Sequence, residues 1–250
     1  MILSFLSKLN VTKFLKLLFP ARRYGIYLRN LLMYWYVSLR PAVNLNELVD
    51  RHFKIWSEMN HINKAGLQLA IEKMSQNKPF IFETGSSAYG TNSSRLFDSV
   101  VQKLSGNFHS TDISGNPSRS LKFQHSKRTK LHVCDSVQFI HNHLKFITDK
   151  VDLCYLDSFD VDWQNPLPSA EHGFLEYLNI RPFLHQGSVL VIDDTPARLS
   201  FIPENYHSFA LRFQESYGVL PGKGAFVLKI IKSTAPESII HHEYNLVIKF

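Results

Sequence analysis

The spacing of hydrophobic positions divides this chain into helical and extended segments. From residue 45 to 75 the apolar side chains recur every three or four positions, which predicts helices. Beyond residue 77, short apolar runs that end in an acidic residue or a glycine alternate with stretches of helical spacing. The predicted strands cover residues 78–85, 107–112, 130–136, 151–157, 188–194, 224–232 and 244–250. The predicted helices between them cover residues 93–104, 137–147 and 170–184, the last one closed by Gly187.

Strands and helices that alternate at this interval build βαβ units around a parallel sheet. We therefore predict an α/β fold, a Rossmann-like, doubly wound, mostly parallel sheet with helices on both faces. The domain is expected over residues 46–250, after a basic, hydrophobic, helical N-terminal extension over residues 1–45. In such sheets ligands bind beyond the carboxyl ends of the strands, so the residues at those ends decide the function.

Basic charge is confined to the extension. The formal net charge is +7, which alone would suggest nucleic-acid binding. However, seven of the 28 basic residues and no acidic residue precede Glu47, so the remaining 21 basic residues face all 21 acidic ones. The domain is neutral, and no nucleic-acid partner is expected. Cys134 and Cys154 lie within apolar runs, which is typical of reduced thiols in a cytoplasmic protein.

The extension leaves several interpretations open. Its apolar runs over 2–19 and 24–39 are interrupted by basic residues and are too short to span a bilayer, and no signal-peptide cleavage site follows them. Aromatic rings and lysines suit peripheral contact with an anionic membrane surface through residues 1–40. The alternative is a helical extension packed on the domain or on a second subunit in a homo-oligomer. A mitochondrial presequence is a third interpretation.

Acidic residues stand at the ends of five successive predicted strands. These ends are Glu83-Thr84-Gly85-Ser86, Asp112, Asp135-Ser136, Asp157 and Asp193-Asp194. One Asp at such a place is commonly a helix N-cap. Five in succession predict instead a functional edge of the sheet.

The first two strand ends indicate the ligand. Gly85 allows the backbone to turn tightly, but the loop has neither the lysine nor the further glycines of a phosphate-binding loop. Asp112 follows Gly85 by 27 residues, a spacing that suits a carboxylate bound to both ribose hydroxyls. Asp135 and Ser136 would then border the adenine. A cationic nucleoside without phosphate, S-adenosylmethionine, fits these positions.

Over roughly residues 79–232 the chain resembles class I S-adenosylmethionine-dependent methyltransferases. It is most similar to the metal-dependent O-methyltransferases of the macrocin, sugar and catechol type, because Glu83-Thr84-Gly85 looks like the macrocin-type first motif and Asp112 like the ribose-binding acid. The resemblance implies methylation of a hydroxyl on a sugar, a glycolipid or another secondary metabolite. Two features depart from the pattern: Ser87 replaces the second glycine, and no lysine base follows the fourth strand.

The resemblance also implies a divalent-metal triad of Asp157, Asp193 and Asp194. Three carboxylates without His or Cys form a hard oxygen site that suits Mg²⁺, with Mn²⁺ or Ca²⁺ as alternatives. His172, at the start of the helix after the fourth strand, is the candidate general base, and Asp157 would contribute through the metal. Lys223, on a glycine-flanked loop expected to be mobile, is a candidate to close over the cofactor or an anionic acceptor.

Two other functions remain as alternatives. The D-x-D of Asp160-Val161-Asp162 is typical of metal-dependent glycosyltransferases, although it leaves Glu83, Asp112 and Asp135 without a role. A non-catalytic binding protein on a methyltransferase fold is the second alternative.

Overall fold

The structure, a computed structural model, describes residues 42–86, 90–115 and 125–250. Nearly all of the predicted extension, and with it the predicted membrane or subunit contact, lies outside the described residues. Residues 44–250 form one compact unit. Within the described part of the chain, no helix combines the length and apolar character needed to cross a bilayer.

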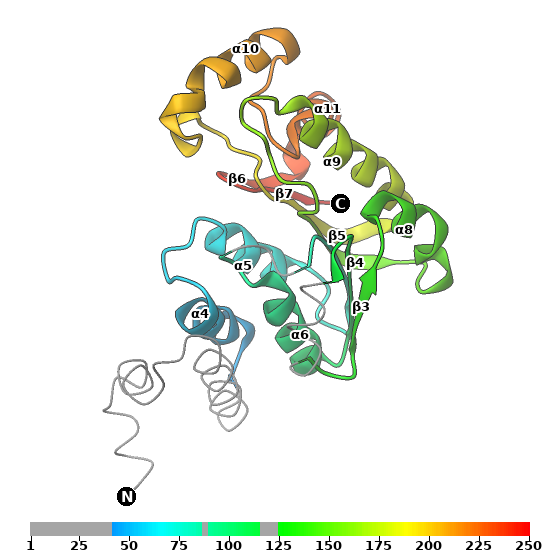
Figure 1. The fold of residues 1–250 in the computed structure, drawn as a ribbon. Helices are drawn as coiled ribbons and strands as arrows, with labels where there is room; N and C mark the ends of the chain where they lie inside the picture. Colours follow the sequence, from blue (N-terminus) through cyan, green and yellow to red (C-terminus); the bar gives the residue numbers. More distant parts are fainter. Residues whose placement is uncertain (1–41, 87–89, 116–124) are drawn as a thin grey trace, which may run out of the picture. The chain divides into compact units, whose positions relative to one another are not determined.

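A seven-stranded sheet forms the centre of this unit (Figure 1). Its strands are β1 (Phe80–Thr84), β2 (Asn107–Asp112), β3 (Thr129–Val133), β4 (Val151–Leu156), β5 (Leu184–Ile192), β6 (Ile239–His242) and β7 (Leu246–Lys249). The spatial order is β3-β2-β1-β4-β5-β7-β6. The first five strands pair in parallel, whereas β7 is antiparallel to both β5 and β6. The chain order reverses between β1 and β4, which is where open α/β sheets bind ligands.

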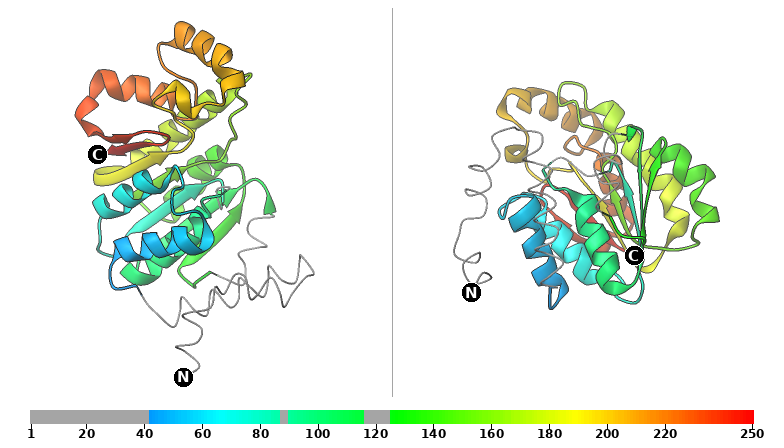
Figure 2. Two further views of the ribbon diagram at one scale, coloured as in Figure 1. Left: turned by 90° about the vertical axis from the view of Figure 1, so that its left-hand side faces the viewer. Right: turned by 60° about the horizontal axis from the view of Figure 1, so that its bottom comes forward.

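Helices cover both faces of the sheet (Figure 2). One face carries α4 (Leu45–Trp56), α5 (Lys64–Lys73) and α6 (Ser93–Leu104), and the other carries α8 (Ser136–Asn142), α9 (Leu167–Ile180) and α11 (Ala225–Thr234). Helix α10 (His207–Tyr217) packs against the start of α9 and α11. Short 3₁₀ turns cover Leu144–Phe146, Arg181–Phe183, Leu199–Phe201, Glu204–Tyr206 and Pro236–Ser238.

Alternation along the strands divides the core into two layers. Tyr155 and Val191 belong to the cluster under α4, α5 and α6, while their neighbours Leu156 and Ile192 belong to the cluster under α8, α9 and α11. Successive strand side chains point to opposite faces, so each strand supplies both layers. The prediction of a doubly wound, mostly parallel sheet is confirmed.

Three details of the predicted elements are wrong. Residues 224–232 are not a strand, because Ala225–Thr234 forms α11, with Val227, Leu228 and Ile231 buried and Lys229 and Ile230 exposed at helical spacing. The helix over 170–184 ends at Ile180, and Gly187 lies inside β5. Strand β6 falls on residues for which no element is predicted.

Candidate functional site

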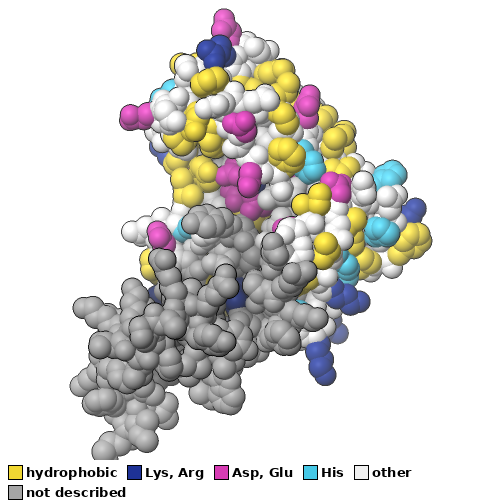
Figure 3. Space-filling model, viewed as in Figure 1, with side chains coloured by type: hydrophobic (Ala, Val, Ile, Leu, Met, Phe, Trp, Pro, Cys, Tyr) yellow, Lys and Arg dark blue, Asp and Glu magenta, His cyan; other side chains and the backbone are white. Residues whose placement is uncertain are grey.

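The five acidic strand ends meet at one edge of the sheet. The register pairs Thr84 of β1 with Leu156 of β4, and Leu156 with Ile192 of β5. The residues that follow these positions therefore emerge side by side. In Figure 3 acidic side chains gather in the middle of the face shown. The edge predicted from the sequence thus exists in the fold.

Gly85 brings the loop after β1 very close to the end of β4. Its φ is +75°, and a Cβ at this position would lie 2.2 Å from the carbonyl oxygen of Asp157. Its N–H donates to the carbonyl of Thr111 at 2.9 Å, which ties the loop to β2 as well. Only glycine meets both the conformation and the close approach.

Glu83 and Thr84 fix the frame around this loop. The carboxylate of Glu83 is fully buried and accepts hydrogen bonds from the hydroxyls of Ser93 (2.5 Å), Ser94 and Ser110 (2.6 Å). Two of these serines are the first residues of α6, so Glu83 anchors the start of that helix beside β1. Thr84 is also buried, and its carbonyl accepts from the N–H of Asp157 at 3.0 Å.

Asp112 lies directly beside the loop. One carboxylate oxygen accepts from the N–H of Ser86 at 3.0 Å and the other from the N–H of Ser114 at 2.6 Å. The Ser86 hydroxyl in turn contacts the Ser110 hydroxyl at 2.7 Å. Each carboxylate oxygen can accept a second hydrogen bond, so the held carboxylate retains capacity for two ligand hydroxyls.

Asp135 serves as the N-cap of α8, because its side chain accepts from the N–H of Gln138 at 2.9 Å. The next residue, Ser136, is buried, and its hydroxyl lies 3.1 Å from Nε2 of His172. The structure therefore brings a predicted adenine neighbour and the predicted base together. The capping hydrogen bond occupies one carboxylate oxygen of Asp135, and the residue stays at the acidic edge of the sheet.

His172 lies in a small polar cluster between β4 and α9. Its Nε2 is 2.9 Å from the hydroxyl of Ser158, which also donates to the buried carboxylate of Glu176 at 2.7 Å. Burial lowers the pKa of the imidazole, but the Glu176 carboxylate 3.6 Å away outweighs it, so the net pKa is raised above 6.5. Ser158 and Glu176 are site residues that the sequence pattern does not reveal.

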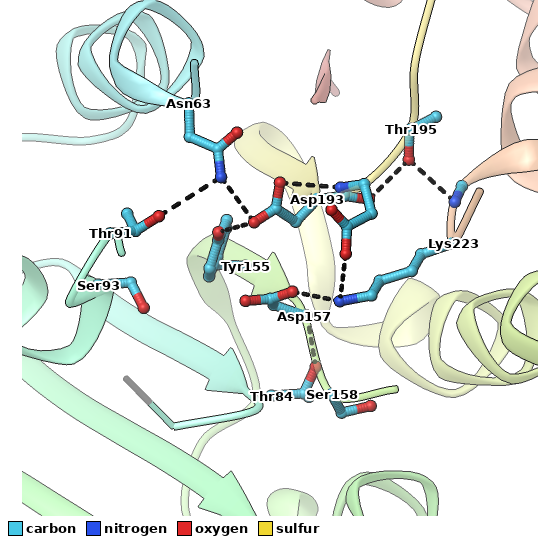
Figure 4. Close-up of polar contacts among 12 residues, drawn as sticks. Asn63, Thr84, Thr91, Ser93, Tyr155, Asp157, Ser158, Asp193, Thr195 and Lys223 are labelled. Atoms are coloured by element: carbon cyan, nitrogen blue, oxygen red, sulfur yellow. Dashed lines mark hydrogen bonds and ion pairs between the residues drawn. The ribbon is translucent and has the colours of Figure 1, made fainter. Parts of the chain in front are cut away.

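Lys223 occupies the middle of the acidic edge (Figure 4). Its side chain is 3% exposed, and its ammonium contacts Oδ1 of Asp157 and lies 3.0 Å from Oδ2 of Asp194. Burial alone would lower its pKa, but the surrounding carboxylates raise it above the usual value, so the group stays charged. The side chain of the loop residue is therefore buried at the acidic edge in this structure.

Asp193 has different hydrogen-bond partners from Asp194. Its carboxylate accepts from the hydroxyl of Tyr155 at 2.5 Å, from the amide of Asn63 at 2.7 Å and from the N–H of Asp194 at 2.8 Å. Burial raises the pKa of Asp193 to about 6. Asp194 instead accepts from the hydroxyl of Tyr244 at 2.6 Å. The two neighbouring acids thus belong to different contact sets.

This arrangement does not fit the predicted metal triad. Among residues 42–86, 90–115 and 125–250, no three His, Cys, Asp or Glu side chains are grouped to hold a metal ion. Asp157 and Asp194 already share the ammonium of Lys223, and both oxygens of Asp193 accept from neutral donors. A divalent ion would need these contacts to be broken first.

The D-x-D lies on the surface. Asp160 and Asp162 are exposed, and Asp162 accepts from the N–H of Gln164 at 2.9 Å, which caps a turn.

No protein-family model and no curated protein sequence matches the chain. Solved structures match its fold. MycE methyltransferase from the mycinamycin biosynthetic pathway, in complex with Mg, SAH (S-adenosylhomocysteine) and mycinamycin VI, is 16% identical, with 84% of this chain and 54% of that chain covered and a TM-score of 0.54. A second MycE structure, with Mg and SAH, is 14% identical, with 84% of this chain and 55% of that chain covered and a TM-score of 0.51. Apo CalS11, a TDP-rhamnose 3′-O-methyltransferase of calicheamicin biosynthesis, is 12% identical, with 87% of this chain and 91% of that chain covered and a TM-score of 0.49.

The chain has the fold of the class I S-adenosylmethionine-dependent methyltransferases, as predicted from its sequence. It spans about half the length of the MycE structures, 54% and 55% of them. At these identities the likeness establishes the fold and not the activity.

Proposed function

We propose that this protein is an S-adenosylmethionine-dependent O-methyltransferase that binds its cofactor across the ends of β1 and β2. The observation that carries the proposal is the joint placement of Gly85 and Asp112. The glycine lets the loop approach a ligand closely, and the N–H of Ser86 holds the carboxylate of Asp112 beside that loop. A carboxylate with spare acceptor capacity suits a ribose diol, and an acidic, lysine-free loop disfavours a nucleotide phosphate. The SAH bound in both MycE structures is consistent with this cofactor.

The proposed reaction is a direct methyl transfer. The hydroxyl oxygen of the acceptor attacks the methyl carbon of the sulfonium, and a new O–C bond forms as the C–S bond breaks. The bonding pair remains on sulfur, which leaves neutral S-adenosylhomocysteine. The hydroxyl proton passes to a base, for which we propose His172. Its position beside Glu176 would stabilise the imidazolium that results.

For the acceptor we propose a hydroxyl of a sugar, a glycolipid or another secondary metabolite. Mycinamycin VI in the MycE complex supports this class of small molecule. The MycE structures contain Mg, whereas the contacts of Asp157, Asp193 and Asp194 described above do not fit the predicted Mg²⁺. Since the ammonium of Lys223 lies between Asp157 and Asp194, the proposed reaction contains no step through a metal.

A thermal-shift experiment distinguishes this function from the glycosyltransferase alternative. We expect S-adenosylhomocysteine to raise the melting temperature of the full-length protein and a nucleotide sugar to leave it unchanged. Asp112→Asn should weaken the shift, while the exposed Asp162→Asn, the matched control within the D-x-D, should retain it in full. A shift with the nucleotide sugar alone, lost in Asp162→Asn, would overturn the proposal.

Transfer of a labelled methyl group from S-adenosylmethionine to a panel of hydroxyl compounds tests catalysis itself. Asp157→Ala should then lose turnover yet keep its S-adenosylhomocysteine shift. If it keeps turnover, Asp157 is not part of the catalytic site. A non-catalytic binding protein would show the shift and transfer methyl to none of the acceptors.

A further inference from the structure

The backbone around Lys223 is built to bury this residue at the acidic edge. A Cβ on Gly222 would lie 2.2 Å from the carbonyl oxygen of Asp194, and one on Gly224 would lie 2.6 Å from the hydroxyl of Thr195. On the facing helix α9, a Cβ on Gly173 would lie 2.2 Å from the carbonyl oxygen of Lys223 itself. Three glycines therefore permit close contacts on both flanks of the lysine and from the helix opposite.

Hydrogen bonds hold this segment in place. The N–H of Lys223 donates to the carbonyl of Asp194 at 3.1 Å, and the N–H of Gly224 donates to the hydroxyl of Thr195 at 2.9 Å. Helix α11 begins at Ala225 and fixes the chain beyond. The lysine thus reaches the carboxylates from a rigid position, which distinguishes it from a surface lysine that folds back onto a nearby acid.

The ammonium compensates part of the acidic charge of the cluster. Asp157 and Asp194 contact Lys223 directly, while Asp193 is stabilised by the neutral donors Tyr155 and Asn63. A buried ammonium that loses its carboxylate partners is strongly destabilising, because the charge is left without compensation. A divalent ion that displaced the ammonium from Asp157 and Asp194 would leave the ammonium without these partners. This destabilisation would add to the free energy needed to dehydrate the ion.

We propose that the ammonium of Lys223 is the resident cation of the cluster formed by Asp157 and Asp194, in the place where the sequence predicts a divalent metal. The two carboxylates account for two of its three N–H donors. The third can donate to the oxygen of the acceptor as that oxygen loses its proton, so a fixed positive charge meets the developing negative one. The inference deepens the proposed function and rests on it for this role toward the acceptor.

Direct binding of Mn²⁺ to the full-length protein, followed by electron paramagnetic resonance, tests the proposal without a known acceptor. We expect the wild type to bind no Mn²⁺ at this cluster, and chelation of divalent ions to leave its melting temperature unchanged. Lys223→Met should gain Mn²⁺ binding by at least about tenfold, because two uncompensated carboxylates then attract a hard cation. Lys229→Met, which removes an exposed lysine of α11, should behave as the wild type.

A double variant tests the proposal in case Lys223→Met alone folds poorly. Lys223→Met combined with Asp157→Asn removes one charge of each sign, and it should be more stable than Lys223→Met alone and bind no Mn²⁺. Wild-type protein that binds Mn²⁺, and loses it in Asp157→Asn, would overturn the proposal. A folded Lys223→Met without any gain in Mn²⁺ binding would also contradict it. Binding of S-adenosylhomocysteine in the same samples reports separately on the proposed function, since Lys223 is not placed at Asp112.

Discussion

Replacing Gly85 by alanine tests the close approach on which the proposed cofactor site depends. Gly85 has φ +75° and lies against the carbonyl of Asp157, with only 2.2 Å for a Cβ. Gly218, at the end of α10, has nearly the same φ of +79° but nothing within 4 Å of its Cβ position. Gly218→Ala is therefore a matched control, which introduces the backbone strain without the collision.

The two variants should differ by the cost of the collision. Alanine in the left-handed region costs roughly 1–2 kcal/mol, which both variants share. In a domain of this size that corresponds to a fall in melting temperature of about 2–8 °C. Moving two backbone segments apart should cost Gly85→Ala a further 1–3 kcal/mol, on the order of the usual penalty for overpacking. Its melting temperature should then lie about 2–12 °C below that of Gly218→Ala.

Thermal unfolding with and without S-adenosylhomocysteine provides the readout. Gly85→Ala should lose at least about tenfold in affinity, because a displaced loop no longer places the N–H of Ser86 against Asp112. Gly218→Ala, far along the chain from that loop, should keep the wild-type affinity. Equal melting temperatures and equal affinities in the two variants would show that the close approach at Gly85 does not support cofactor binding.

Three other predictions concern stability and the extension. The pKa of buried His52 is lowered to about 4, chiefly by burial, so the unfolded chain binds a proton below pH 6.5 that the folded protein excludes. When the pH falls from 7.5 to 5, the free energy of unfolding of the wild type should therefore decrease by about 2 kcal/mol more than that of His52→Gln. Urea unfolding at both pH values measures this difference, and equal decreases would contradict the prediction. Asp98 is buried and accepts hydrogen bonds from Ser126 and Thr129. Asp98→Asn should therefore lower the free energy of unfolding by about 2–4 kcal/mol without changing the affinity for S-adenosylhomocysteine. A loss below about 0.5 kcal/mol would show that these hydrogen bonds do not stabilise the fold. Deleting residues 1–40 should abolish cosedimentation with anionic liposomes, and unchanged cosedimentation would exclude the membrane interpretation.

The sequence pattern predicts the sheet and its acidic edge because both follow from local spacing. Parallel strands bring their carboxyl ends to one edge, so the strand pattern places Asp112, Asp157 and Asp193 at the same edge. The sequence pattern does not reveal helix α11, because Val227 and Ile231 favour strands and their burial depends on packing within the cluster under α8, α9 and α11.

The contacts that define the acidic cluster are not visible in the sequence. Tyr155 reads as a core position of β4, yet its hydroxyl reaches Asp193. Asn63 precedes α5, 130 residues from the same carboxylate. Asp193 and Asp194 follow the last residue of β5, and Asp194 has a φ of +41°, so alternation along the strand does not give the direction of their side chains. The contacts of Lys223 with Asp157 and Asp194 likewise join segments that are far apart in the sequence.

Isothermal titration of the full-length protein with S-adenosylmethionine measures binding at the proposed cofactor site. We expect one binding site in the wild type, an affinity at least about tenfold lower in Asp112→Asn because the ribose loses its charged acceptor, and unchanged affinity in Asp162→Asn. No binding to the wild type, or equal binding to Asp112→Asn, would contradict the claim that the ends of β1 and β2 hold this cofactor.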